Sequence, residues 1–148
     1  MISTPEIAAT WREQLLARRN ELRGGSFRDA AVARCALVAV ADDATSAADR
    51  GTVAELVAAD PVLRNFPVDD SRALFEDNCN RLANDPVLDC AHVLRQIAKA
   101  VHKPAEADAV VRTGIPIGGA AGACGPAATE AVRDACRTLR LAPERFGL

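Results

Sequence analysis

The stretch SFRDAAVARCALVAVADDATSAADR, residues Ser26 to Arg50, decides the fold. Its middle part, AAVARCALVAVA at positions 30–41, is apolar nearly all round when it is wound as an α-helix. A helix of this kind must be covered on every side, so the pattern predicts a central, buried helix. The residues SFRD at positions 26–29 resemble a capping box, with Asp29 in place of the usual Glu, and predict where this helix begins.

Further helix starts can be recognised on both sides of this stretch, each with a capping residue, a proline or an acidic residue in its first turn. The predicted starts are TPE at Thr4, SFRD at Ser26, SAAD at Ser46, DDS ending at Ser71, DP at Asp85, KPAEAD at Lys103 and GPAATE at Gly125. No segment has the pattern of a strand, and aromatic residues make up only 3% of the chain. We therefore expect an all-α fold, a compact bundle of about seven helices in a single domain of residues 1–148. Residues 1–25 would form an N-terminal helix extension.

Apolar residues at helical spacing predict the inward sides of three helices. These residues are Leu74, Phe75, Cys79 and Leu82 in the fourth helix, Val87, Ala91, Leu94, Ala98 and Val101 in the fifth, and Val132, Ala135, Cys136 and Leu139 in the seventh. A weak internal repeat aligns residues 39–57 with residues 118–136 and pairs Val53 with Val132. Ala-rich helices can match by chance, but the repeat is consistent with two pseudo-repeated halves.

Charge is distributed unevenly along the chain, although its net value is only −2. Residues 41–90 carry eleven acidic and four basic side chains, and both flanking regions are net positive. This polarity suggests docking onto a basic partner through acidic residues such as Asp42, Asp43, Asp69 and Asp70, although helices also carry charge simply to solvate their outer faces. Neither the net charge nor the few aromatic residues favour nucleic-acid binding.

The sequence lacks two features that would direct a protein into or across a membrane. No apolar run approaches the roughly 20 residues that a membrane-spanning helix needs. The N-terminal residues MISTPEIAATWREQ lack the basic and then apolar pattern of a signal peptide. We therefore expect a cytoplasmic protein without a membrane span.

Catalytic arrangements are hard to assemble from this chain. Its two histidines, His92 and His102, are ten residues apart and lack the spacing of a metal-ligand pair. Three of the four serines, Ser26, Ser46 and Ser71, lie at predicted helix starts, where capping explains them better than catalysis does. We therefore expect no enzymatic activity.

The cysteines do not form a recognisable framework. They are odd in number and lack CxxC spacing, which argues against structural disulfides and a zinc ribbon. The five are Cys35, Cys79, Cys90, Cys124 and Cys136. We expect them to be small buried hydrophobic residues, with Cys35 inside the central helix. The alternative is a thiol protein that handles oxyanion or redox stress, which would need an exposed and activated thiol.

Asp42, Asp43 and Asp49 follow the apolar helix closely and are the candidate metal ligands. Carboxylate oxygens suit hard cations such as Ca²⁺, Mg²⁺ and Mn²⁺, but the spacing is not that of an EF-hand, because Val53 stands where a bidentate Glu is required. The same stretch can instead end one helix and cap the next, with Ser46 as the cap. Spacing alone leaves both interpretations open.

Three stretches resemble the TerB-type tellurite-resistance family. They are FRDAAVARCALVAVADDATSAADR from Phe27, LRNFPVDDSRALFED from Leu63, and EADAVVRTGIPIGGAAGACGPAATEAVRDACRTLRLAPERFGL from Glu106 to Leu148. The resemblance runs from about Phe27 to the end of the sequence. It implies a compact all-helical domain with two related halves, each with an acidic loop between helices. It also implies a non-catalytic role in tellurite and stress resistance, in a metal-linked assembly with membrane proteins.

Carried over by position, the resemblance separates the two loops. In the first loop, Asp42 and Ser46 match the family pattern, and Asp49 stands where a Glu is usual. In the second, Gly122 keeps the motif, but the positions that are usually acidic hold Ala121, Ala123, Gly125 and Ala128. We therefore expect no ion at the second loop, and either none or one weakly bound divalent cation at Asp42, Asp43 and Asp49.

These observations lead to one prediction and two alternatives. The prediction is a TerB-like adaptor in the cytoplasm, peripheral to the inner face of the membrane, with membrane-associated stress-resistance proteins as its partners. The alternatives are a divalent-metal-binding protein that uses the Asp42–Asp49 loop and a thiol protein. The sequence identifies neither the partner nor the oligomeric state.

Overall fold

The computed structural model describes residues 24–41, 54–55, 62–85, 88–112 and 126–146. Within these residues every regular element is helical, which confirms the all-α prediction. The elements are the α-helices α2 (Gly25–Ala41), α4 (Val68–Asn84), α5 (Leu88–Ala98), α6 (Pro104–Arg112) and α8 (Pro126–Thr138), and the 3-10 helices η1 (Leu63–Asn65) and η2 (Pro143–Phe146). Five of the seven predicted helices are thus present. The helix predicted to start at Thr4 lies outside the described residues, and of the one predicted to start at Ser46 only residues 54–55 are described, which are helical. The total of seven is therefore not confirmed.

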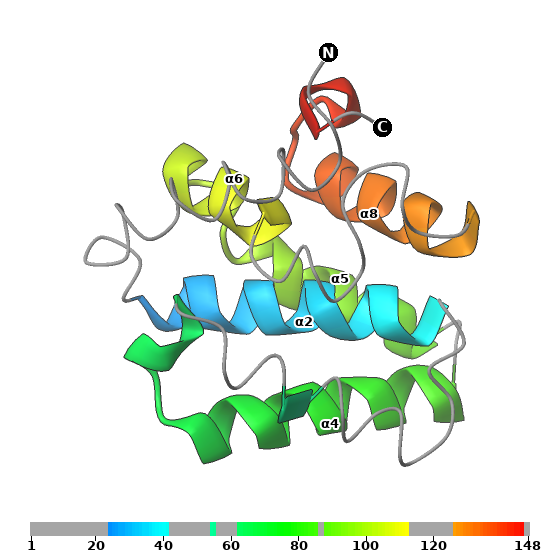
Figure 1. Ribbon diagram of the computed structural model, residues 1–148. Helices are drawn as coiled ribbons and strands as arrows, with labels where there is room; N and C mark the ends of the chain where they lie inside the picture. The colour runs from blue at the N-terminus through cyan, green and yellow to red at the C-terminus, as the bar shows by residue number, and fades with distance from the viewer. Residues whose placement is uncertain (1–23, 42–53, 56–61, 86–87, 113–125, 147–148) are drawn as a thin grey trace.

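Helix α2 is the centre of the molecule. It crosses the middle of the bundle, with α4 on one side, α6 and α8 on the other, and α5 behind it (Figure 1). All four of these helices contact it. Every residue from Ala30 to Ala39 is buried, as expected for a helix that is apolar nearly all round. The prediction of a central helix, with Cys35 buried in it, is confirmed.

The start of α2 differs from the predicted capping box. The helix begins at Gly25, so Ser26 lies inside its first turn. The Arg28 amide donates to the Gly24 carbonyl at 3.2 Å. The Asp29 carboxylate does not return to Ser26; it accepts hydrogen bonds from Arg28 and, at 2.8 Å, from Nζ of Lys99. Asp29 therefore ties α2 to the end of α5, and the capping-box prediction is wrong.

Helix α4 begins earlier than predicted. Pro67 precedes its first residue, Val68, and the DDS motif lies within the first turn rather than before it. Asp69 and Asp70 suit this place because carboxylates interact favourably with the positive end of the helix dipole. The Ser71 hydroxyl is buried and caps nothing, so the capping role predicted for it is wrong.

The inward sides of the helices were predicted with mixed success. In α4, Phe75, Cys79 and Leu82 are buried and Leu74 is partly buried, and in the last helix all four predicted residues are buried. In the fifth helix the prediction is only partly right: Leu94 packs against the core and Ala98 and Val101 are half-buried, but Ala91 is exposed and the fully buried residues of α5 are Val93 and Ile97. Val93 and Ile97 are four residues apart, so they lie on one side of α5, and this side faces the core. Val87 and the Val53 side of the proposed repeat lie outside the described residues.

The end of the chain closes over α6. Helix α8 ends at Thr138, and a Schellman motif follows it. In this motif Arg140 has a φ of 58°, and the Leu141 amide donates a hydrogen bond to the Cys136 carbonyl. The short helix η2 then places the buried Phe146 under two guanidinium groups, those of Arg112 at 5.6 Å and Arg145 at 5.7 Å. This arrangement gives a physical reason for the L-P--F pattern of Leu141 to Phe146 in the sequence.

Candidate functional site

The predicted metal ligands Asp42, Asp43 and Asp49 lie outside the described residues, as do Ala121, Ala123 and Gly125 of the second loop. Ala128 lies within α8. In the segments that the structure does describe, no three His, Cys, Asp or Glu side chains gather as a metal site would require. The weak-ion site at the first loop therefore stays a prediction.

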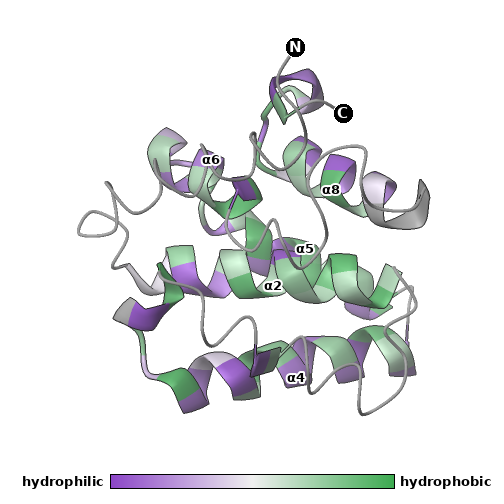
Figure 2. Ribbon diagram, in the orientation of Figure 1, coloured by the Kyte–Doolittle hydropathy of each residue, from purple (hydrophilic) through white to green (hydrophobic). Residues whose placement is uncertain are grey.

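The outer side of α4 carries the acidic excess of the described residues. Its exposed residues include Asp69, Asp70, Glu76 and Asp77, which we call the acidic face. The whole helix carries these four acidic side chains and only two basic ones, Arg72 and Arg81. The buried residues of α4, such as Phe75 and Cys79, lie on the opposite side of the helix from the acidic face. Figure 2 shows that α4 carries more hydrophilic residues than the mostly apolar α2.

Ion pairs neutralise only half of the acidic face. Arg72 contacts Asp69 and also Glu55, which precedes the helix, each at 2.9 Å. Arg81 contacts Asp77 at 2.9 Å. Asp70 and Glu76 have no ion pair within the described segments. Two exposed carboxylates thus lack an ion pair in the described part of the chain.

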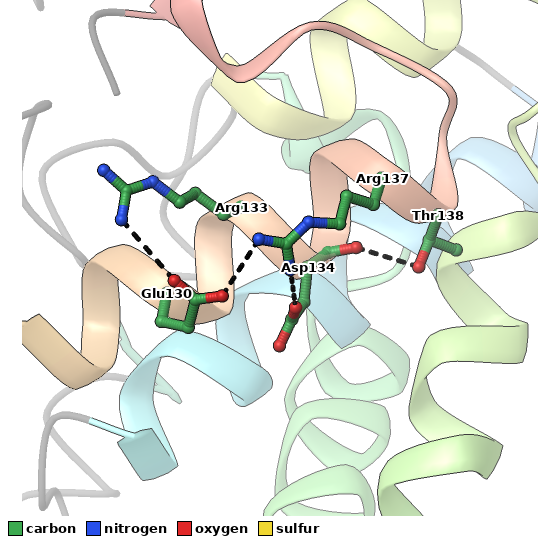
Figure 3. A network of polar contacts seen from close by, with 5 residues as sticks. All are labelled: Glu130, Arg133, Asp134, Arg137 and Thr138. Atoms are coloured by element: carbon green, nitrogen blue, oxygen red, sulfur yellow. Dashed lines mark hydrogen bonds and ion pairs between the residues drawn. The ribbon is translucent and has the colours of Figure 1, made fainter.

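On the outer side of α8, by contrast, the acidic side chains form ion pairs with basic side chains of the same helix (Figure 3). Glu130 contacts Arg137 at 3.1 Å and Arg133 at 3.5 Å. Asp134 is also paired with Arg137, and its carbonyl accepts a hydrogen bond from Thr138 at 2.9 Å. The hydrogen bond from Arg137 holds the pKa of Glu130 below its usual value. Two acidic and two basic side chains thus neutralise each other on α8, unlike those on α4.

The cysteines are mostly inaccessible. Cys35, Cys79 and Cys136 are buried, Cys90 is half-buried, and none of these four forms a disulfide. Burial raises the pKa of the Cys136 thiol to about 11, so very little thiolate forms there at neutral pH. Cys124 lies outside the described residues. The buried thiols lack the exposure that the alternative of a thiol protein requires.

Sequence reasoning missed four buried polar side chains. They are Arg34 on α2, Ser71 and Asn78 on α4, and Glu106 on α6. Glu106 lies 3.9 Å from Nζ of Lys103, and Arg34 takes part in an interaction within the protein. Helical spacing could have revealed two of them. Arg34 interrupts an otherwise apolar run, and Asn78 lies three residues after Phe75 and four before Leu82, on the same side of the helix.

Comparisons with known proteins give one match. The family model described as "Tellurite resistance protein TerB" matches residues 28–148. Searches of curated proteins and of solved structures found no match. Among the described helices, none combines the length and apolar character that crossing a membrane requires.

Proposed function

Because the chain belongs to the TerB tellurite-resistance family over residues 28–148, we propose that it is a non-enzymatic adaptor in tellurite and stress resistance. The acidic face of α4 is its docking surface, and its partner presents basic residues. The partner belongs to a membrane-associated assembly. The observation that carries this proposal is the pair of exposed carboxylates, Asp70 and Glu76, which have no ion pair in the described residues.

Electrostatics explain why this face suits an adaptor. Complementary charge accelerates encounter and selects among partners, even where it adds little to the final affinity. Carboxylates already paired within the protein, such as Glu130 and Asp134 on α8, have less to offer an incoming cation. Asp70 and Glu76 have no such pair to break among the residues that the structure describes. The acidic face is therefore the described surface best suited to a basic partner.

We expect neutralisation of the acidic face to abolish capture of the partner. The bait is the immobilised full chain in lysate of its own source cells, and the captured proteins are quantified by mass spectrometry. The variant Asp70→Asn/Glu76→Gln should retain less than about a tenth of the partner bound by the wild type. Raising the salt should release the partner from the wild type, because exposed charges are screened beyond about 8 Å at physiological ionic strength.

The matched control is Glu130→Gln/Asp134→Asn, which changes net charge by the same amount on α8. It should capture the partner as the wild type does. Surface ion pairs contribute only about 0–1 kcal/mol, so this control should also stay folded. Equal capture by the α4 variant and the wild type would exclude the acidic face as the docking surface.

A further inference from the structure

The side of α4 that faces the bundle is unusually polar. Five of its residues are buried, namely Ser71, Phe75, Asn78, Cys79 and Leu82. Ser71 and Asn78 are each only 1% exposed. Neither the Ser71 hydroxyl nor either polar atom of the Asn78 amide has a hydrogen-bond partner in the part of the chain that the structure describes.

Such atoms oppose the docking of the helix. A polar atom that leaves water without gaining a partner loses hydrogen bonds that nothing replaces. On α4 this loss works against the burial of three apolar side chains, Phe75, Cys79 and Leu82. When α4 separates from α2, Ser71 and Asn78 regain hydrogen bonds to water. These polar atoms therefore make the docked state of α4 less stable than apolar side chains at the same places would.

The neighbouring helices have fewer such atoms, although on α6 the Oε2 atom of the buried Glu106 also lacks a hydrogen-bond partner in the described residues. The residues of α8 that are buried, among them Ala131, Val132, Ala135 and Cys136, are all apolar. On α2 the one buried charged side chain, Arg34, is engaged in an interaction within the protein. The outer side of α4, in contrast, is already solvated. Of the helices that pack on α2, α4 has the most buried polar atoms without a hydrogen-bond partner in the described residues, although it also has the most extensive contact with α2.

We propose that α4 opens as a separate unit while the rest of the bundle stays folded, and that this opening makes Cys79 accessible. Proteins commonly open in such cooperative units, with free energies below that of global unfolding. Ser71 and Asn78 set the opening equilibrium, because hydration of their polar atoms favours the open state. The buried thiols are built-in reporters, since Cys79 lies on α4, Cys35 on α2 and Cys136 on α8.

The test is thiol labelling of the full chain with N-ethylmaleimide, without denaturant, read by peptide mass spectrometry. Each rate is divided by the rate of the same cysteine in the unfolded chain. This correction removes the effect of the raised pKa of Cys136. We expect Cys79 to be at least about tenfold less protected than Cys35 and Cys136. Protection of Cys79 within about threefold of that of Cys35 would overturn the proposal, because all sites would then react through global unfolding.

Substitutions test whether the two polar side chains set the equilibrium. Ser71→Ala removes only the unpartnered hydroxyl, and Asn78→Leu replaces the amide by an apolar group of similar shape. We expect Asn78→Leu to slow labelling of Cys79 about tenfold and Ser71→Ala about threefold. The control Asn84→Leu changes an exposed residue of the same helix and should slow labelling no more than about twofold, the gain from helix propensity alone. If neither Asn78→Leu nor Ser71→Ala exceeded this control, the role assigned to these side chains would be refuted.

Discussion

Leu37→Ala is expected to lower the free energy of unfolding by about 2–5 kcal/mol, measured by urea denaturation. Leu37 is the largest aliphatic side chain in the buried run of α2 and is only 8% exposed. Its truncation loses apolar burial and leaves a cavity between helices that pack on α2 from several sides. The surrounding helices cannot collapse into that space without losing their own contacts with α2.

Leu88→Ala is the matched control. Leu88 begins α5 and is 71% exposed, so the same truncation there should change the free energy of unfolding by less than about 0.5 kcal/mol. A cost below about 1 kcal/mol at Leu37 would mean that α2 does not occupy the centre of the bundle.

Phe146→Ala is expected to cost about 3–5 kcal/mol in the same measurement. The Phe146 ring is 2% exposed, and the guanidinium groups of Arg112 and Arg145 lie over it. Asp108 holds both cations, each at 3.1 Å. Loss of the ring therefore removes apolar burial and two cation–π contacts at once, and frees η2 from α6.

Two further variants separate the ring from the charges around it. Phe146→Leu keeps most of the apolar volume and should cost less than half as much as Phe146→Ala. Asp108→Asn leaves the ring in place and should also cost less than the loss of the ring, because its partner Arg145 is half exposed and the amide oxygen of Asn can still accept a hydrogen bond from Arg112. If Phe146→Ala cost no more than Phe146→Leu, packing of the C-terminal ring would not stabilise the bundle.

The sequence predicted the fold where the pattern of apolar residues was unambiguous. The run from Ala30 to Ala39 has no polar side wide enough to face water, so burial on all sides was the one available solution. The burial of Cys136 on α8 and of Leu139 just after it was also predicted correctly, from the helical spacing of their apolar side chains. The family resemblance from about Phe27 onwards also agrees with the matched residues 28–148.

Local signals failed where tertiary contacts decided the outcome. Asp29 has the right spacing to return to Ser26, but Lys99, seventy positions away, offers a stronger partner. The sequence predicts Ser71 as a helix cap, but α4 starts at Val68, and the Ser71 hydroxyl is buried. A pattern within one segment cannot reveal these competing contacts.

The candidate site was predictable in outline only. The acidic middle of the chain was apparent from its charges, and Asp69 and Asp70 do lie exposed at the start of α4. What the sequence could not show is which acidic residues are already neutralised. Arg72 and Arg81 pair with Asp69 and Asp77, whereas Glu76 is left over, and this distinction depends on side-chain geometry.

Growth on tellurite tests most directly the claim that the acidic face of α4 carries the function. The measurement is the lowest tellurite concentration that stops a strain lacking this protein, after it receives the wild type, Asp70→Asn/Glu76→Gln or the α8 control Glu130→Gln/Asp134→Asn. At equal protein levels, the wild type and the α8 control should restore growth, and the α4 variant should not, because its docking surface has lost the two carboxylates without an ion pair in the described residues. Full restoration by the α4 variant would contradict the account.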